Sequence, residues 1–179
     1  SSGSTILENG KTGIYFDGIN DYFNTPSTIM TDPSVDDYKS AISVVGIDRT
    51  STDTLVYEIS YSAAQQVAAS FNRSSSNSIQ TRTSFGSVND DSQVLSKDQN
   101  LIFHIAQSSL NSNNSFLDGH LFSGTLSGRS SGSGNFLGQG FSIVNFHKGT
   151  FQEFVFYNAD QSTNLTGIET NINDFYSIY

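Results

Sequence analysis

The chain has 179 residues, a formal net charge of −9, no cysteine and no tryptophan. Its length fits one domain with a sizeable core, and its negative charge argues against broad binding to nucleic acid, whose phosphates it repels. The absence of cysteine excludes disulfides, thiolate metal sites and a cysteine nucleophile. The sequence holds no apolar run near the roughly 20 residues of a membrane-spanning helix, so we expect no membrane insertion.

Residues 1–10 are predicted to be a linker or an expression remnant, because the opening Ser-Ser-Gly-Ser is typical of such segments. Residues 11–179 are predicted to form one domain. Apolar and polar residues alternate with period two through most of it, which indicates strands with one buried face. The predicted strands are Gly13–Asp17, Ser40–Asp48, Thr54–Tyr61, Gln66–Asn72, Ser78–Phe85, Leu101–Gln107, Ser115–Phe122, Phe141–His147 and Thr150–Asn158.

Clusters of Ser, Gly and Asn separate these segments, and the interior has no long helical pattern. Short strands joined by such turns predict an antiparallel sandwich instead of βαβ units. In Thr54–Tyr61, alternation puts Tyr57 on one face and Glu58 with Val56 on the other. Glu153 lies among apolar residues, so it needs a partner, and Arg82 or a backbone amide would serve.

The C-terminal segment Asn164–Tyr176 has its apolar residues at helical spacing. Thr166 and Glu169 have the spacing of a capping box, and starts at Ser162, Thr163 or Asn164 also fit. We expect one amphipathic helix of about three turns, docked on the sandwich so that it closes an edge or an end.

Three segments carry a resemblance to a known family. The chain opens with Phe16-Asp-Gly-Ile-Asn-Asp-Tyr22, contains the Asp118-Gly119 turn in Phe116–Phe122, and closes with Gly149–Asn158 and the terminal helix. This order resembles the laminin-G-like jelly roll of the concanavalin A-like lectin/glucanase superfamily, over Lys11–Tyr179. The resemblance implies an all-β fold: an antiparallel jelly-roll β-sandwich with a short C-terminal helix.

The last segment, Tyr157–Tyr179, is similar to modules of bacteriophage and bacterial surface proteins. This similarity implies an extracellular location, on a cell surface or a virion. It also allows homo-oligomerisation through a parent protein.

The superfamily includes glycoside hydrolases, which act through two carboxylates flanking the scissile bond. Glucanase-type members carry acids at alternating strand positions, and this sequence has no Asp or Glu pair at i and i+2. Residues 128–132 match Gly-x-Ser-x-Gly, but no helix follows them, as a nucleophile elbow requires. We therefore predict that the chain is not an enzyme. Glycoside hydrolysis is the less favoured hypothesis.

The leading hypothesis is a non-catalytic module that binds carbohydrate or another cell-surface ligand. Polar strand-face residues could bond sugar hydroxyls, and tyrosine rings could stack on the sugar, although Tyr57 and Tyr61 fit a core role equally. The alternative is a structural decoration or assembly module that contacts neighbouring virion or surface subunits. The candidate ligand-binding residues are Glu58, Gln80, Arg82, Asn145 and His147, with Tyr57, Tyr61 and Tyr38 as stacking candidates.

The three histidines lack the ligand spacing of a zinc site. The resemblance implies calcium instead, because laminin-G-like modules often hold it at the rim. Asp36-Asp37 and Asn89-Asp90-Asp91 could supply oxygen ligands, and we name Asp90 and Asp91 as the candidates. The alternative for both segments is a solvated acidic loop.

Overall fold

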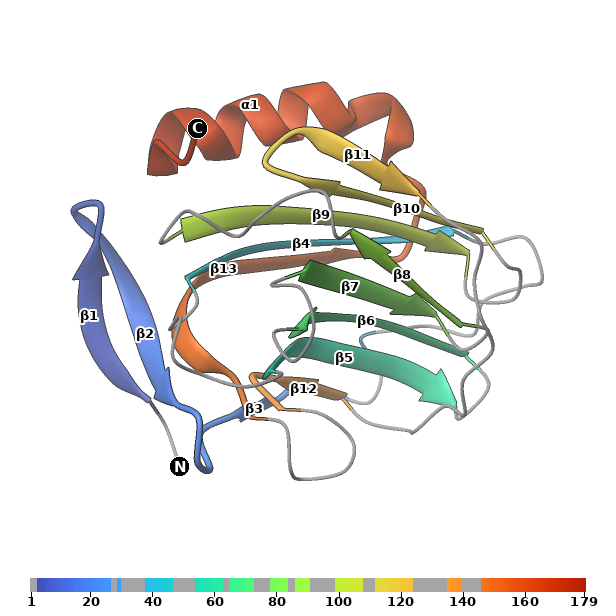
Figure 1. Cartoon of the computed structure of the whole chain (residues 1–179). Helices are drawn as coiled ribbons and strands as arrows, with labels where there is room; N and C mark the ends of the chain where they lie inside the picture. Colours follow the sequence, from blue (N-terminus) through green and yellow to red (C-terminus); the bar gives the residue numbers. More distant parts are fainter. Residues whose placement is uncertain are drawn as a thin grey trace.

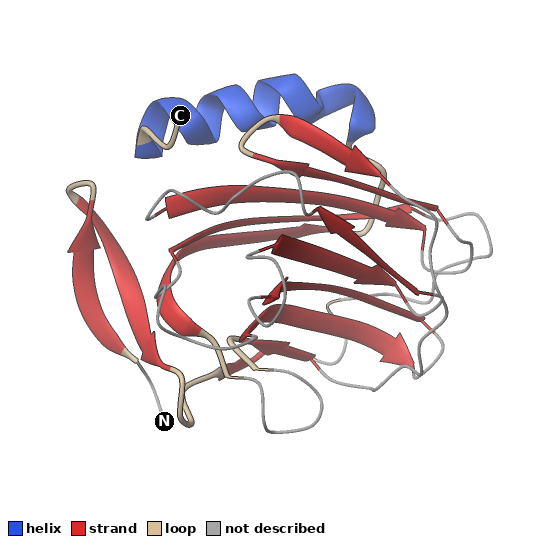
Figure 2. Ribbon diagram, viewed as in Figure 1, coloured by secondary structure: helices blue, strands red, loops and turns tan. Residues whose placement is uncertain are grey.

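Two antiparallel β-sheets and one α-helix make up most of the part of the chain that this computed structural model describes (Figure 1). The described residues are 3–26, 29, 38–46, 54–62, 65–72, 78–83, 86–90, 99–107, 112–123, 135–139 and 146–179. Figure 2 shows the strands in two layers and the helix on the outside of one of them. The predicted antiparallel, mostly β fold with a C-terminal helix is confirmed.

The seven-stranded sheet has the spatial order β1, β2, β13, β4, β9, β10, β11. In that order its strands are Ser4–Glu8, Lys11–Asp17, Lys148–Tyr157, Tyr38–Gly46, Gln99–Gln107, Ser112–Leu117 and His120–Ser123. The six-stranded sheet has the order β3, β12, β5, β6, β7, β8. Its strands are Phe23–Asn24, Asn135–Leu137, Thr54–Ser62, Gln65–Asn72, Ser78–Thr83 and Gly86–Asp90.

Most of the predicted strands overlap an observed one, with two differences. The predicted strand 115–122 is not continuous: the predicted Asp118-Gly119 turn divides it into the hairpin of β10 and β11, and both turn residues have positive φ. The Asp-Gly pair suits such a turn because glycine accepts positive φ without strain. In the predicted strand 141–147, Phe146 and His147 lie outside any strand, and residues 141–145 lie outside the described part.

Residues 1–10 were predicted as a linker, but Ser4–Glu8 form β1, paired along their whole length with β2. Asn9 and Gly10 make the hairpin turn with positive φ. The Thr150 hydroxyl bonds the Glu8 carboxylate, and the Gln152 side-chain amide donates to the Glu8 carbonyl at 3.1 Å. These bonds fasten the hairpin to β13, which the Ser- and Gly-rich composition of the first four residues did not indicate.

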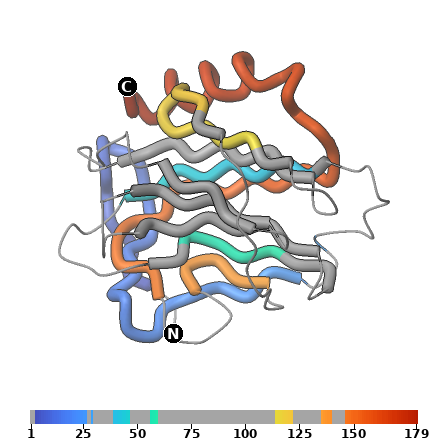
Figure 3. The backbone as a smooth tube through the Cα atoms, turned by 45° about the vertical axis from the view of Figure 1, so that its right-hand side comes forward, coloured from blue at the N-terminus to red at the C-terminus, as the bar shows by residue number. Residues whose placement is uncertain are grey.

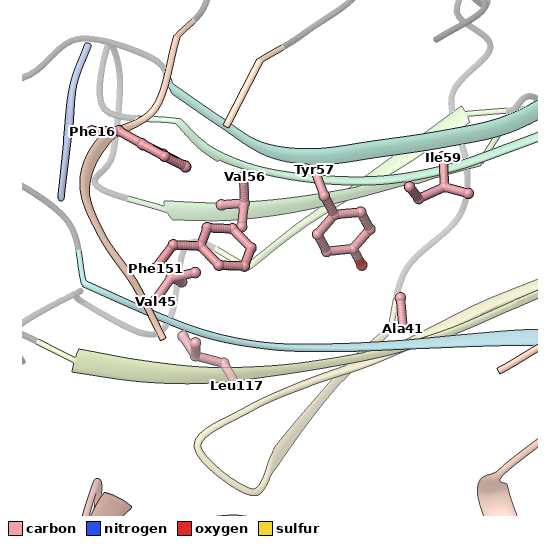
Figure 4. Packing of buried hydrophobic residues seen from close by; sticks show 8 residues of the cluster. All are labelled: Phe16, Ala41, Val45, Val56, Tyr57, Ile59, Leu117 and Phe151. Atoms are coloured by element: carbon pink, nitrogen blue, oxygen red, sulfur yellow. The ribbon is translucent and has the colours of Figure 1, made fainter. Parts of the chain in front are cut away.

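The main core lies between the two sheets (Figure 4). β2, β4, β10 and β13 contribute to it from one sheet and β5 from the other. Alternate positions face inward except where a bulge adds a residue to β5 or β13. Phenylalanine and tyrosine rings fill much of this core. The chain has 14 Phe and no Trp, so these two residue types supply its aromatic volume. Its buried members are Phe16, Ala41, Val45, Val56, Tyr57, Ile59, Leu117 and Phe151.

A β-bulge in β5 overturns one predicted face. Alternation placed Val56 with Glu58, yet Val56 is completely buried in the same cluster as Tyr57. The register with β6 shifts between Leu55 and Tyr57, which leaves Val56 as an extra residue. Two consecutive residues therefore enter the core before alternation resumes at Glu58.

A second bulge, in β13, reverses the faces of that strand. The register with β4 shifts between Phe151 and Glu153, so that Phe151 and Phe154 both pack in the core between the sheets. Strict alternation would have turned Glu153 inward with Phe151. The extra residue, Gln152, sends Glu153 and Val155 to the opposite face, under the helix.

Helix α1 (Leu165–Tyr176) follows a short 3₁₀ turn, Ser162–Asn164, and covers the outer face of the seven-stranded sheet (Figure 3). Ile172 and Tyr176 pack there on Ile42 and Val44 of β4. The helix thus covers a face and does not close an edge or an end. No described helix has the length and hydropathy to cross a membrane.

The capping box predicted for Thr166 and Glu169 is wrong, whereas the alternative start at Asn164 matches the residue that precedes the helix. Thr166 lies within the first turn, and the residue that precedes the helix, Asn164, makes no side-chain capping bond. The turn at Ser162–Asn164 starts the helical path earlier, so the first amides of α1 do not depend on Thr166. For Glu153 the sequence offered Arg82 or a backbone amide as a partner, and the structure supplies the side chain of Tyr176, which hydrogen-bonds it.

Candidate functional site

One continuous row of residues crosses all strands of the six-stranded sheet on its outer face, away from the other sheet. Each residue pairs directly with its neighbour on the next strand, so all share one face. Tyr57 and Ile59 point into the core, and Glu58 between them belongs to the opposite face. The row, which we call the polar row, is Asn24, Phe136, Glu58, Ala68, Arg82 and Ser87.

The adjacent row has a different composition, which confirms the assignment of the two faces. It is largely apolar and contains Tyr57, which is buried between the sheets. Its members, in strand order, are Phe23, Leu137, Tyr57, Ala69, Thr81 and Val88. The six-stranded sheet is therefore amphipathic, with its polar positions gathered on the outer face.

The outer face continues beside the polar row with further polar positions. Gln80 pairs with Ser70 on one side and Asn89 on the other. In the described strands of this sheet, the register brings a single acidic position, Glu58, and a single basic one, Arg82, to this face. One small residue, Ala68, separates these two positions across the sheet.

An aromatic cluster lies at one end of the polar row. The Tyr22 ring contacts Phe136 at a centroid distance of 5.9 Å and Phe146 at 6.3 Å. All three side chains are half-buried, so part of each ring remains available to solvent. The sequence did not point to these three rings as binding residues. The relevant pattern, the alternation Asn135-Phe136-Leu137, is too short to be recognised as a strand.

Three of the predicted binding residues, Glu58, Gln80 and Arg82, are brought onto this one face by the register. Glu58 itself is only 3% exposed. A carboxylate buried to that extent is suited to orienting neighbouring groups more than to direct contact with a ligand.

Tyr57 and His147 have no exposed surface. The Tyr57 ring packs 5.1 Å from that of Phe154, and burial raises the pKa of its hydroxyl. It therefore takes the core role that the sequence also allowed, and it offers no ring face for stacking on a sugar.

His147 packs its ring edge-on against Phe16 and Phe151. Its Nε2 lies 3.2 Å from the Thr150 carbonyl oxygen. Burial lowers the pKa of His147 to about 4, while backbone hydrogen bonds to Thr150 and Gly46 oppose the shift. The imidazole is thus neutral at pH 7 and holds a loop against the core.

The other predicted residues lie apart from these. Tyr61 is in β5 near a second register shift, and Tyr38 begins β4 in the other sheet. Asp90 ends β8 opposite Ile79. Asn145 and Asp91 lie outside the described residues, so binding by Asn145 and calcium at Asp90 and Asp91 stay predictions. Among described side chains, no group of three His, Asp or Glu gathers as a metal site.

No family model matches the sequence, and no curated protein matches it. Solved structures do match. The chain resembles Trypanosoma rangeli sialidase in complex with the inhibitor DANA, with a TM-score of 0.57 and 10% identity over 86% of this chain and 26% of that one. It also resembles the same sialidase in complex with sialic acid, with a TM-score of 0.56 and 11% identity over 92% of this chain and 28% of that one.

The chain spans about a quarter of the length of the sialidase chains that it matches. At this low identity the likeness concerns the fold alone. It identifies the class of structure: a sandwich-like domain of antiparallel sheets that also occurs as part of a larger carbohydrate-processing protein.

Proposed function

We propose that the chain is a non-catalytic recognition module that binds carbohydrate, or another cell-surface ligand, through the outer face of its six-stranded sheet. The polar row carries this proposal, because its positions combine amide, carboxylate, guanidinium and hydroxyl side chains with an aromatic one. Such groups bond sugar hydroxyls, while aromatic rings pack on the apolar face of a pyranose.

The fold supports the proposal. The motifs imply a lectin-like jelly roll, and two facing antiparallel sheets with a helix on one of them are compatible with that topology. The matching sialidase structures contain DANA and sialic acid. Glycans that carry sialic acid are therefore the first ligands to test, together with bacterial envelope polysaccharides.

The absence of catalysis is part of the proposal. Hydrolysis by the usual mechanism needs two carboxylates about 5–9 Å apart, and Glu58 is the single acidic position on this face in the described strands. We also propose an extracellular setting, on a virion or a cell surface, which rests on the similarity of the C-terminal segment to phage and bacterial surface modules.

A glycan array followed by titration tests the proposal. The folded protein, supplied with calcium, should bind at least one glycan. Gln80→Ala and Arg82→Ala should each weaken that binding about tenfold or more, since each removes hydrogen bonds to the ligand. Asn171→Ala, an exposed change on helix α1 behind the other sheet, should leave it unchanged.

The absence of binding to every glycan would contradict the proposal. So would binding that both substitutions on the outer face leave intact. Release of free sugar from a bound glycan would contradict its non-catalytic part.

Assembly with neighbouring subunits is the second candidate function, and one observation favours it. Strand β1 is the outermost strand of its sheet, and Leu7 on it is 73% exposed. Unpaired strand edges are ready partners for another chain. A concentration-dependent rise in mass on sedimentation, abolished by Leu7→Lys, would support assembly, whereas a monomer at all concentrations would oppose it.

A further inference from the structure

We propose that strand β1 pairs with β1 of a second copy of this chain, antiparallel and in a register centred on Ile6. The two seven-stranded sheets then join edge to edge about a twofold axis. This inference rests on assembly, the second candidate function above, and names its partner and its register. It does not depend on carbohydrate binding, because β1 and the polar row belong to different sheets.

Among the described strands, β1 is the long sheet edge without a neighbour on its outer side. The sheets end in β1 and β11 and in β3 and β8. β8 and β11 contact each other, so they close one side of the sandwich. β3 has two residues, whereas β1 has five and forms the outer strand of the N-terminal hairpin (Figure 1). β1 therefore offers the longest row of backbone groups to another chain.

The sequence of β1 lacks the devices that keep strand edges from pairing. Natural edges are protected by Pro, Lys or a β-bulge. Ser4–Glu8 contains no Pro and no Lys, and it pairs with β2 without a shift in register. Leu7, near its end, is 73% exposed. An exposed leucine on an unprotected edge indicates a surface that a partner strand covers.

The length of β1 selects the register. A twofold axis perpendicular to the sheet keeps every residue on its own face, so the paired positions differ by an even number of residues. A centre at Ile6 engages all five residues of both strands, and every other centre engages fewer. Ser4 then lies opposite Glu8 of the second copy, and Thr5 lies opposite Leu7.

This register covers the exposed leucine. Thr5 and Leu7 share one face of β1, and both are exposed in the single chain. Across the axis, Leu7 lies opposite Thr5 of the second copy and diagonal to its Leu7, which is within reach of long side chains. Both leucines thus lose contact with water, which favours association.

The charges of the hairpin favour an antiparallel pair. Glu8 faces Lys11 across the turn of the hairpin, so Lys11 offsets its charge. In the antiparallel pair the two Glu8 positions lie about 14 Å apart along the strands, beyond the screening length of about 8 Å at physiological ionic strength. A parallel pair would bring them to about 5 Å.

Sedimentation equilibrium tests the pair. A strand of five residues is about 17 Å long, and its interface is smaller than the roughly 800 Å² per partner of stable complexes. We therefore expect a weak dimer, with a mass that rises from one chain toward two as the protein concentration approaches about 1 mM. The mass should stop at two, because the pair uses both edges. Leu7→Lys should weaken association about tenfold or more, since it places two lysines diagonally across the axis.

The absence of cysteine allows a direct test of the register. Ile6→Cys places two thiols across the axis, with Cα atoms about 4.5–5.5 Å apart, which a disulfide can span. Mild oxidation should therefore link this variant into a dimer. Ser4→Cys, on the same face of the same strand, is the control, because its two copies lie about 14 Å apart and should stay largely unlinked. Thr5→Cys mixed with Leu7→Cys should form the mixed dimer faster than either variant links to itself.

The outcomes distinguish this inference from the functions proposed above. The mass of one chain at every concentration would overturn both the pair and the assembly function. Growth past two chains, or linking of Ser4→Cys as fast as of Ile6→Cys, would overturn the twofold pair and leave assembly in place. If Ile6→Cys fails to fold, the mixture of Thr5→Cys and Leu7→Cys decides, because both positions are exposed.

Discussion

The hydroxyl of Tyr176 donates a hydrogen bond to the carboxylate of Glu153, and this contact joins helix α1 to strand β13. Tyr176 is 7% exposed and packs on Ile42 and Val44. The bond exists because the bulge at Gln152 turns Glu153 outward, toward the helix. One extra residue in a strand thus decides where the helix docks.

Tyr176→Phe should lower the free energy of unfolding by about 1.5–3 kcal/mol at pH 7, since it deletes a hydrogen bond to a charged group. Urea denaturation would measure this loss. Tyr157→Phe removes a hydroxyl from a half-buried tyrosine that also packs beneath the helix, and should cost clearly less. Equal stability of Tyr176→Phe and the unaltered protein would show that the bond contributes nothing.

The same tyrosine should produce an alkaline transition. Burial, followed by the Glu153 charge and hydrogen bond, raises the pKa of Tyr176 to about 12 from 10.0. The folded state therefore favours the protonated form. Its contribution is fully present below pH 10 and is lost as the pH rises toward 12. Unfolding curves at pH 9–12 should show a steeper loss for the unaltered protein than for Tyr176→Phe.

His147 should make the fold sensitive to acid. Its pKa is lowered to about 4 from 6.5, mainly by burial, so the folded state favours the neutral ring. The stability that this ring contributes is present above pH 6.5 and is lost as the pH falls through about 4. Histidine NMR resonances should show one imidazole that stays neutral down to about pH 5.

A substitution separates this effect from general acid denaturation. His147→Leu should flatten the loss of stability between pH 6.5 and 4, although it lowers stability at pH 7 by about 1–3 kcal/mol through the lost hydrogen bond to Thr150. His120→Gln, at an exposed hairpin position, should leave the acid profile unchanged. An unaltered profile in His147→Leu would assign the acid transition to other groups.

Two glycines should respond to alanine with opposite signs. At Gly138, φ is +83° and a Cβ atom would lie 2.6 Å from the Phe16 ring, so Gly138→Ala should destabilise the fold by about 2–4 kcal/mol. At Gly167, in helix α1, a Cβ atom meets nothing within 4 Å. Gly167→Ala should stabilise the protein by about 0.5–1 kcal/mol. Thermal unfolding of both variants checks the contrast, which equal shifts would contradict.

Asn173 should hold the C-terminal residues against the helix. Its Oδ1 accepts the amides of Ile178 and Tyr179 at 2.9 Å each, and its Nδ2 donates to the Tyr179 carbonyl at 2.7 Å. Asn173→Ala should cost about 1–2 kcal/mol and should speed amide exchange at residues 178 and 179. The neighbouring exposed Asn171, changed to alanine, is the control. Unchanged exchange in Asn173→Ala would refute this role.

Much of this fold could be predicted from local patterns. Alternation located most strands, and the Asp118-Gly119 turn and the terminal helix follow from residue chemistry that operates over a few positions. The prediction of which residues face the core was wrong where a β-bulge interrupts a strand. Val56 and Glu153 each occupy the face opposite to the one that strict alternation assigns, because an extra residue has no signature in a single sequence.

The candidate site also has a part that local sequence patterns predict and a part that they do not. Glu58, Gln80 and Arg82 could be chosen because a polar residue between apolar neighbours on a strand faces away from the core. Their alignment with Asn24 and Phe136 could not, because it depends on pairing between strands that lie far apart in the sequence. The segments that hold the buried side chains of Asp21 and Gln139 likewise become neighbours only through the pairing of β3 with β12.

The order of residues alone therefore determines that the chain forms short amphipathic strands, with turns between them and one helix at the end, since these depend on neighbours in sequence. Tertiary structure decides which strands are adjacent, where each bulge shifts a face, and which polar atoms are buried together. Those features arise when distant segments compete for the same hydrogen bonds and the same core volume, and that competition is settled only in the folded chain.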